Sequence, residues 1–380
     1  MPLPSAEARL HCEHLVAHIR EAIDRAGGWM DFSRYMELAL YAPGLGYYVA
    51  GSTKLGTQGD FVTAPEVSPL FGRAVAAQIA GVLNEAGGDV LELGAGSGRL
   101  AADLLAELTM RNSLPARYRI LEVSPELRQR QQALLRARVP GMIDRIDWID
   151  ALPQHLTGVI LANEVLDALP FHLLAWRDDA IFERGVIRQG DSFGWAEHDL
   201  RSPALREAAS ALPVSAPYLS ELSLAVPALV GTLAAALETG VMLLIDYGFG
   251  RSEYYHPQRN RGTLMCHYRH RSHDDPFYLP GLQDITAHVD FTAVAGAGID
   301  AGLNLLGYAT QAQFLINCGI ADLLARTPAD EAGTYLPLSA GVQKLLSPAE
   351  MGELFKVIAL GRGIGAPLAG FSQGDKSRLL

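Results

Sequence analysis

The chain contains 380 residues, of which 49% are hydrophobic and 19% are charged, and its formal net charge is −11. This length is ample for a large hydrophobic core, either as one big domain or as one domain with an insertion. The acidic balance and the lack of a lysine/arginine block argue against duplex nucleic acid as the main partner.

Cysteine spacing and the lengths of apolar runs bear on the compartment. Cys12, Cys266 and Cys318 lie far apart and form no paired motif, which fits a reducing environment. The first residues lack the apolar core of a signal peptide, and no apolar run approaches the length of a membrane span. We therefore expect a cytoplasmic protein without a membrane span.

Helical periodicity dominates the first part of the chain. The pattern predicts helices over 5–26, 32–41 and 67–86. Asp31 is a plausible cap for the second of them, because a short acidic side chain accepts hydrogen bonds from the first helical N–H groups. We assign 1–88 to a helical N-terminal region whose last segment caps the expected cleft.

The most informative segment reads Asp89-Val-Leu-Glu-Leu-Gly-Ala-Gly-Ser-Gly98. A short apolar run over 89–93 is typical of a buried parallel strand, and a helical pattern opens at Arg99, directly after three closely spaced glycines. A strand, a tight glycine turn and a helix N-terminus together build a cradle for a nucleotide-type cofactor. The spacing G-x-G-x-G differs from the G-x-G-x-x-G that brings a backbone close to a pyrophosphate.

The acid before the first glycine indicates which cofactor the turn accepts. A carboxylate there repels a pyrophosphate but suits a cationic group, and S-adenosylmethionine (SAM) carries an ammonium and a sulfonium without a phosphate. The pattern Glu-x-Gly-x-Gly-x-Gly is similar to the first motif of class I SAM-dependent methyltransferases. We therefore expect SAM to contact Glu92, Gly94, Ala95, Gly96 and Gly98.

Strands and helices alternate after this turn. The pattern predicts strands over 117–123, 145–148 and 158–163 and helices over 99–110 and 125–137. Glu122 lies at the expected ligand edge of a parallel sheet, where an acid can accept both ribose hydroxyls. NAD enzymes place an acid at the same point, so Glu122 supports an adenosine ribose without separating SAM from NAD.

The alternation breaks after residue 170. Short apolar runs over 171–218 predict an inserted antiparallel β element, and the pattern resumes with a helix over 219–238. The later elements are predicted as a strand over 241–246, a helix over 290–301, a strand over 304–308, two or three helices and a last strand over 355–360. The polar residues of 363–380 predict a flexible tail.

These elements predict an α/β fold with a parallel sheet covered by helices. We assign the cofactor-binding domain to 89–170 and 219–362. The predicted sheet has seven strands, and late helices follow it, as in the Rossmann-like fold of class I methyltransferases.

Longer motifs resemble one known family. They begin at Gly59-Asp-Phe-Val-Thr-Ala-Pro-Glu, Asn163-Glu-Val-Leu-Asp-Ala-Leu-Pro, Ile245-Asp-Tyr-Gly, Gly262-Thr-Leu-Met-Cys-His and Asp284-Ile-Thr-Ala-His-Val-Asp-Phe. Together they resemble the MidA family, the bacterial relatives of a mitochondrial complex I assembly methyltransferase. The resemblance implies a class I fold, SAM as donor and S-adenosylhomocysteine as product. In the mitochondrial relative it implies symmetric dimethylation of an arginine on a complex I core subunit.

An arginine acceptor makes a specific chemical demand. Its guanidinium stays protonated in water, so carboxylates must hold the planar fork and orient a nitrogen towards the methyl group. Arginine methyltransferases place acidic pairs after the fourth strand, where this chain has Glu164 and Asp167, and an i, i+3 spacing puts both on one side of a helical turn. We expect these two residues, followed by Asp246, to bind the acceptor or remove its proton. The alternative for the pair is helix capping on a solvated face.

Further residues are assigned to the two ligands. For the cofactor we add Val123 beside Glu122, Asp150 and Ala151 near the adenine, and Asn163 near the methionine moiety. For the acceptor we add Glu66, Tyr47, His288 and Asp290, although Glu66 also suits a helix start and Tyr47 also suits a core.

Five histidines fall within 33 residues: His256, His267, His270, His273 and His288. Their spacing does not match a common zinc motif, and we expect no metal. A solvated or acceptor-facing loop fits them better.

The leading function is therefore methyl transfer from SAM to an exposed arginine of a protein partner. Methylation of a small molecule and a SAM-binding assembly factor without catalysis remain open. An NAD oxidoreductase is disfavoured by the glycine spacing. The sequence leaves open whether the chain forms a homodimer.

Overall fold

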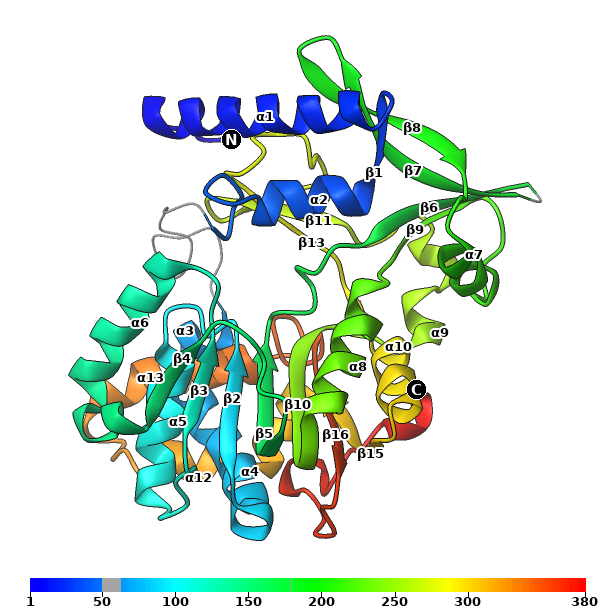
Figure 1. Cartoon of the computed structure of the whole chain (residues 1–380). Helices are drawn as coiled ribbons and strands as arrows, with labels where there is room; N and C mark the ends of the chain where they lie inside the picture. Colours follow the sequence, from blue (N-terminus) through cyan, green and yellow to red (C-terminus); the bar gives the residue numbers. More distant parts are fainter. Residues whose placement is uncertain (50–62, 179) are drawn as a thin grey trace. The chain divides into compact units, whose positions relative to one another are not determined.

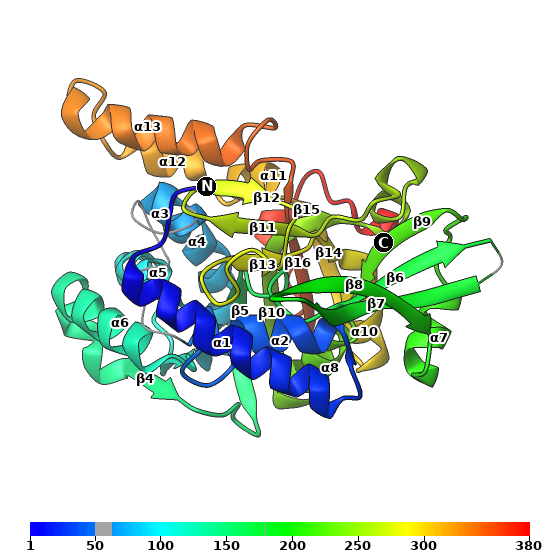
Figure 2. The same ribbon diagram turned by 90° about the horizontal axis from the view of Figure 1, so that it is seen from above.

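The computed structural model describes residues 1–49, 63–178 and 180–380 and divides the chain into two compact units. Unit 1 consists of Met1–Phe61, Asp167–Pro227 and Gly250–Asp290. Unit 2 consists of Val62–Leu166, Ala228–Phe249 and Phe291–Leu380. Each unit is therefore assembled from segments that lie far apart in the sequence, as the colours of Figures 1 and 2 show.

Unit 2 is built on a mixed sheet in the order β15-β16-β10-β5-β2-β3-β4 (Figure 1). The strands are β2 (Asp89–Leu93), β3 (Tyr118–Leu121), β4 (Ile146–Ile149), β5 (Leu156–Asn163), β10 (Leu237–Phe249), β15 (Asn304–Thr310) and β16 (Phe355–Arg362). From β10 to β4 neighbouring strands are parallel, whereas β16 runs antiparallel to both β10 and β15. The predicted α/β fold is thus confirmed, and the predicted parallel sheet is present from β10 to β4, whereas β16 makes the whole sheet mixed.

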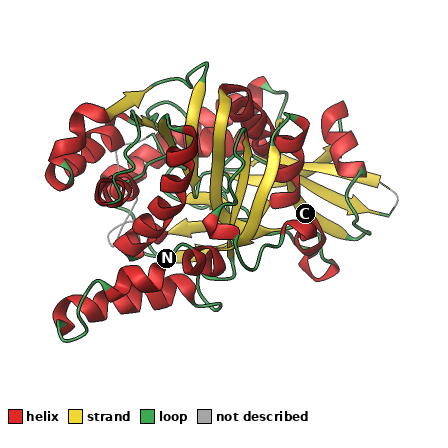
Figure 3. Ribbon diagram, turned by 90° about the horizontal axis from the view of Figure 1, so that it is seen from below, coloured by secondary structure: helices red, strands yellow, loops and turns green. Residues whose placement is uncertain are grey.

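Helices lie on both sides of these strands (Figure 3). Unit 2 contains α3 (Ala64–Val67), α4 (Pro69–Ala86), α5 (Arg99–Met110), α6 (Pro125–Arg138), α10 (Phe291–Asp300), α11 (Gln311–Asn317), α12 (Ile320–Ala325), α13 (Ala332–Leu346) and the 3₁₀ turns η1 (Pro140–Arg145), η3 (Ala369–Phe371) and η4 (Ser377–Leu379). Phe71 of α4 and Leu104 of α5 share one buried cluster with Val90 and Val159 of the sheet. Strands covered by helices on both faces bury the side chains of both faces, which explains the mostly apolar sequences of β2 and β5.

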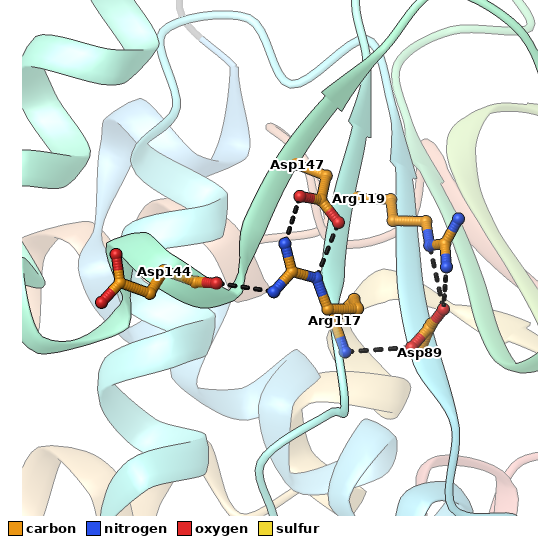
Figure 4. A network of polar contacts seen from close by, with 5 residues as sticks. All are labelled: Asp89, Arg117, Arg119, Asp144 and Asp147. Atoms are coloured by element: carbon orange, nitrogen blue, oxygen red, sulfur yellow. Dashed lines mark hydrogen bonds and ion pairs between the residues drawn. The ribbon is translucent and has the colours of Figure 1, made fainter.

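A network of charged side chains ties together the beginnings of β2, β3 and β4 (Figure 4). Arg117 donates to both carboxylate oxygens of Asp147, and its backbone N–H donates to Asp89 at 2.9 Å. Arg119 pairs with the other oxygen of Asp89 at 2.9 Å. These contacts fix the strand register at the end of the sheet opposite to the strand C-termini.

Unit 1 contains two antiparallel sheets. The first has the order β1-β7-β6-β9, with β8 paired to β7, and the second has the order β12-β11-β13. Their strands are β1 (Trp29–Asp31), β6 (His172–Arg177), β7 (Ala180–Gln189), β8 (Ser192–Asp199), β9 (Tyr218–Leu222), β11 (Met265–Tyr268), β12 (Arg271–His273) and β13 (Asp284–Thr286). The two-residue strand β14 (Val289–Asp290) belongs to neither of these sheets. The predicted antiparallel strands after residue 170 are therefore present.

The helices of unit 1 are α1 (Ala6–Arg25), α2 (Phe32–Tyr41), α7 (Pro203–Ser210), α9 (Arg251–Tyr254) and the 3₁₀ turn η2 (Pro257–Arg259), while α8 (Ala225–Ala236) crosses the boundary of the two units. Asp31 caps α2 as predicted, because its side chain accepts a hydrogen bond from Arg34 N–H. Phe32 and Tyr35 of α2 are fully buried in the core of this unit.

The helix predicted over 219–238 is wrong in its first part. Residues 218–222 form β9, which pairs antiparallel with β6, and the helix α8 starts only at Ala225. The Ser223 hydroxyl accepts a hydrogen bond from Val226 N–H at 3.1 Å and so marks the true helix start. Strand pairing with a distant segment has overridden the local helical pattern.

The flexible tail predicted over 363–380 is also wrong. Phe371 is 7% exposed and packs against Phe314 at a ring distance of 5.4 Å. Lys376 N–H donates to the Tyr308 carbonyl at 2.6 Å, and Asp375 accepts a hydrogen bond from Tyr308 N–H at 3.1 Å. The tail therefore continues the packing of unit 2 beside β15.

The compact units also divide the chain differently from the predicted domains. Residues 63–88 belong to unit 2, and 250–290 belong to unit 1 together with the predicted β element. Within the described ranges, none of the helices is long and apolar enough to cross a membrane.

Candidate functional site

The glycine turn after β2 has the backbone that its sequence suggested. Gly94, Gly96 and Gly98 have φ values of 62°, 54° and 84°, a region that residues with a Cβ rarely adopt. Gly98 is also the left-handed residue that precedes α5. A Cβ at Gly94 would lie 3.1 Å from Val165 Cγ2, so the close packing of Val165 also favours glycine at this position. Ala95, between Gly94 and Gly96 in the sequence, is buried.

A fully buried glutamine fixes this turn to the rest of unit 2. Gln131 of α6 donates from Nε2 to the Gly96 carbonyl and to Glu122 Oε2, both at 3.0 Å. Its Oε1 accepts a hydrogen bond from Trp148 Nε1 at 2.9 Å. The sequence analysis missed Gln131, because a single glutamine in a helix carries no motif. Its place on the apolar face of α6 is the signal that was available.

Glu92 lies behind the turn rather than on its surface. It is 2% exposed, and Tyr118 donates a hydrogen bond to Oε2 at 2.7 Å. The pKa of Glu92 is raised to about 7, mainly by burial; the Tyr118 hydrogen bond lowers it, and the nearby Glu122 carboxylate raises it, within that net value. Near neutral pH this carboxyl group therefore titrates.

Glu122 follows β3 at the carboxyl edge of the parallel strands. Its Oε1 accepts a hydrogen bond from Ser124 N–H at 3.0 Å, and burial raises its pKa in spite of these donors. The next side chain, Val123, is 67% exposed, which is unusual for an apolar residue beside a buried acid. Both predicted ligand contacts therefore lie where ligands of open α/β sheets bind.

The residues assigned to the adenine lie after β4. Asp150 is exposed and pairs with Arg128 Nη2 at 2.6 Å, and Ala151 is exposed beside it. Arg128 also donates to the Glu122 carbonyl at 2.7 Å. The ends of β3 and β4 are thus joined through one arginine.

The segment after β5 begins with a residue in a strained backbone conformation. Glu164 has φ 54° without being glycine, which costs about 1–3 kcal/mol and is typical of functional sites. Its Oε1 accepts hydrogen bonds from Ala64 N–H and from Asn163 Nδ2, both at 3.2 Å. Among the described residues, the buried Oδ1 of Asn163 has no hydrogen-bond partner. A buried acceptor without a donor is costly unless a ligand supplies one.

Asp246 at the end of β10 holds this strained segment in place. It is fully buried, and its Oδ2 accepts hydrogen bonds from Val165 N–H at 3.2 Å and Leu166 N–H at 2.9 Å. The helical turn expected over 164–167 is therefore wrong, because these N–H groups point to Asp246 and Glu164 is left-handed. The role of Asp246 as an acceptor carboxylate stays a prediction.

Glu66 precedes α4 and contacts the glycine turn. Its Oε1 accepts a hydrogen bond from the Ser97 hydroxyl at 2.5 Å, and its Oε2 pairs with Arg99 Nε at 3.1 Å. Ser97 belongs to the cofactor turn and Arg99 begins the helix α5 directly after it, so Glu66 supports that turn. Its assignment to the acceptor stays a prediction.

The remaining candidates lie in unit 1. Asp167 is 8% exposed, and its carbonyl accepts a hydrogen bond from Ala287 N–H at 3.2 Å, which places it beside the segment of His288. Asp290 pairs with Arg251 at 3.3 Å. Tyr47 is 1% exposed, in keeping with the packing role that the sequence left open.

A buried glutamate that the sequence analysis missed organises this part of unit 1. Glu221 accepts hydrogen bonds from the N–H groups of Thr263 and Leu264 at 2.8–3.0 Å and from the Tyr254 hydroxyl at 3.3 Å. The Thr263 hydroxyl in turn accepts a hydrogen bond from His288 N–H at 3.1 Å. Burial raises the pKa of Glu221. No local pattern marks this residue, since its partners lie about 40 residues downstream.

The histidine-rich stretch contains several local caps. His256 accepts a hydrogen bond from Gln258 N–H, and His273 accepts one from Asp275 N–H. Within the part of the chain that the structure describes, the group with metal-ligand spacing is Asp31, His172 and Glu183, which lies outside this stretch. The His172 ring nitrogen is hydrogen-bonded to Glu183 at 2.6 Å.

Comparisons with known proteins point to one kind of enzyme. The family model Methyltransf_28, which describes S-adenosyl-L-methionine-dependent methyltransferases, matches residues 70–309. A crystal structure of a COG1565 superfamily member from Burkholderia thailandensis, bound to S-adenosyl-homocysteine, is 47% identical, covers 100% of both chains and has a TM-score of 0.97.

Curated relatives are more distant in sequence. The protein arginine methyltransferase NDUFAF7 homolog of Drosophila melanogaster mitochondria is 29% identical over 97% of this chain and 91% of its own length. The mitochondrial protein arginine methyltransferase NDUFAF7 of Rattus norvegicus is 28% identical over 92% and 85%.

Proposed function

Because the chain belongs to the Methyltransf_28 family of S-adenosyl-L-methionine-dependent methyltransferases, we propose that it transfers a methyl group from SAM to an arginine of a protein. The proposal has two parts, the position of the cofactor and the nature of the acceptor. The observations that support them lie in different units.

The cofactor position is supported by one observation above others. Three left-handed glycines lie at the carboxyl edge of the sheet, and beside that edge Asn163 has a buried oxygen that lacks a donor among the described residues. The ammonium group of SAM is a donor of the required kind. Glu122 and the exposed Val123 suit the ribose and the adenine. These residues therefore fit SAM.

The chemistry asks little of the protein beyond placement. SAM supplies an already activated sulfonium methyl group. The chain must align the acceptor nitrogen, exclude water and take up the proton that the guanidinium loses. We assign the last task to Glu164 or Asp167, because a carboxylate can both hold the guanidinium fork and accept a proton.

The arginine acceptor rests on the relatives and on the carboxylates of unit 1. The Drosophila and rat proteins are named as protein arginine methyltransferases. Asp167 and Asp290 are at most partly exposed, so their carboxylates lie in surroundings where an ion pair with a guanidinium is less screened than in water.

Methyl transfer from radiolabelled SAM tests this function. The full chain is added to a lysate of the source organism that lacks this gene, with Gly96→Val protein as the inactive control. We expect a labelled protein band whose modified residue maps to arginine by mass spectrometry. Label on another residue would overturn the arginine assignment, and label only in small molecules would overturn the protein acceptor. Intact SAM binding without any labelling would favour an assembly factor.

A further inference from the structure

A pocket of about 570 Å³ opens in unit 1, and its lining includes none of the residues assigned to the cofactor or the acceptor. The last turn of α1, the strand β1, the start of α2 and the end of β8 form its walls. Its polar lining includes Arg25, Asp31, Arg34, His198 and Arg201. The lining thus contains three arginines and one aspartate, although the net charge of the whole chain is −11.

Two of these arginines have no acidic partner. Across the described residues neither Arg25 nor Arg201 forms an ion pair, and Arg25 only donates from Nε to the Glu21 carbonyl at 3.3 Å. Arg34 pairs with Glu37 at 2.6 Å, but both side chains are 50% exposed, so this pair contributes little. Unpaired guanidinium groups around one pocket favour an anionic ligand.

The carboxylate in the pocket does not cancel this charge. Asp31 Oδ1 accepts the capping hydrogen bond from Arg34 N–H at 2.9 Å and lies 3.9 Å from the His172 ring nitrogen. The acid is therefore engaged on the helix side of the pocket. The positive potential of the α2 N-terminus adds to that of the arginines.

The aromatic wall excludes recognition by base stacking on Trp29. Its ring stacks on His198 at 4.5 Å and 9°, and it packs so closely on Gly185 that a Cβ there would lie 2.5 Å from the indole. The indole nitrogen donates to the Ala196 carbonyl at 3.1 Å. Trp29 is therefore a rigid support, and the arginines carry the recognition.

We propose that this pocket binds an acidic segment of the protein acceptor, with Arg25 and Arg201 each holding a carboxylate. The inference rests on the proposed protein acceptor. An arginine presents two parallel N–H groups that match a carboxylate, which suits aspartate or glutamate side chains. The acidic remainder of the chain repels such a segment, so the pocket would also set the orientation in which the acceptor binds.

Binding of a fluorescein-labelled hexaglutamate peptide to the full chain, followed by fluorescence anisotropy at low salt, tests the pocket without requiring methyl transfer. The variant Arg25→Glu/Arg201→Glu should bind about tenfold more weakly or worse. Arg9→Glu/Arg136→Glu is the matched control, because both arginines are exposed outside the pocket and the change in net charge is the same. The control should stay within about twofold of the wild type.

Three results would overturn the inference. The first is equal weakening by both double variants, which would indicate bulk charge. The second is no peptide binding by the wild type at about 1 mM. The third is displacement of the peptide by inorganic phosphate at far lower concentrations than by unlabelled peptide, which would indicate a phosphate site.

A second readout separates this inference from the proposed function. In the lysate assay, the pocket variant should need about tenfold more acceptor for half-maximal labelling, with the plateau rate and the affinity for S-adenosylhomocysteine unchanged. Absence of labelling by the wild type would overturn the methyl-transfer proposal, while the peptide titration would still decide the pocket. A lowered plateau rate with unchanged half-saturation would contradict a docking role.

Discussion

Unit 2 and unit 1 both use a buried carboxylate to fix a turn, yet the two turns differ in how the sequence encodes them. In unit 2, Asp246 receives the N–H groups of Val165 and Leu166 and fixes the segment after β5. In unit 1, Glu221 receives those of Thr263 and Leu264. The first turn lies at the carboxyl end of a parallel strand, which is the general ligand-binding position of open α/β sheets. No comparable rule predicts the position of the second turn from the sequence.

This difference follows the division of the predicted site. The residues assigned to the cofactor all lie in unit 2, in the last residues of a strand of one sheet or in the segment that follows it. Of the residues assigned to the acceptor, Glu66, Glu164 and Asp246 also lie in unit 2. The other four come from three separate segments of unit 1: Tyr47, Asp167, His288 and Asp290. The residues assigned to the cofactor can thus be found from local motifs. The acceptor residues of unit 1 come together only when distant segments of the chain pack against one another.

The largest expected effect is on the cofactor turn. Gly96→Val places a β-branched residue at φ 54° and fills the turn, so we expect SAM affinity to fall by about a thousandfold or more, ~4 kcal/mol, in calorimetric titration. Gly81→Val is the control, because Gly81 is exposed within α4 and a Cβ there meets no atom within 4 Å. Unchanged SAM affinity in Gly96→Val would remove the turn from the site.

The next effect concerns the tail, which the sequence suggested to be flexible. Phe371→Ala removes a ring that packs on Phe314, and we expect the free energy of unfolding to fall by about 3 kcal/mol in urea titration. Leu379→Ala, in the same tail but 55% exposed, should change it by less than about 0.5 kcal/mol. Equal, small effects of the two variants would mean that the tail does not stabilise unit 2.

The free energy of unfolding is expected to depend on pH through Glu92. Its pKa rises from 4.5 to about 7 on folding, so the folded chain holds this proton more tightly than the unfolded chain. The resulting stability is fully present below pH 4.5 and is lost as the pH rises to about 7, by up to ~3 kcal/mol. Urea unfolding of the cofactor-free chain and of its Glu92→Gln variant, repeated from pH 4.5 to 8, measures this loss of stability. Parallel pH profiles of the two proteins would contradict a raised pKa.

The smallest effect separates the two units most sharply. Glu221→Gln replaces one acceptor oxygen by an amide that faces N–H donors, which loosens the Thr263 turn. We expect methyl transfer to fall about tenfold, while S-adenosylhomocysteine affinity stays within about twofold. Glu207→Gln, an exposed change on α7, should leave both unchanged. A parallel loss of cofactor affinity in Glu221→Gln would break the proposed division between the units.

The sequence predicts these elements of unit 2 well because a local residue pattern specifies each of them. The strand at 89–93, the helix at 99–110 and the tight glycine turn between them are found as expected. The pattern fails where a distant partner decides, as at β9, which the pairing with β6 turns into a strand. The same holds for Gln131 and Glu221, whose polar partners lie on other elements.

A crystal structure of the full chain with S-adenosylhomocysteine tests the central claim most directly. We expect the product over the turn of Gly94, Gly96 and Gly98, its ribose within hydrogen-bonding distance of Glu122 and its ammonium group near Asn163 Oδ1. Product bound elsewhere in the chain, or a bound product that leaves both Glu122 and Asn163 without contact, would contradict the proposed cofactor site.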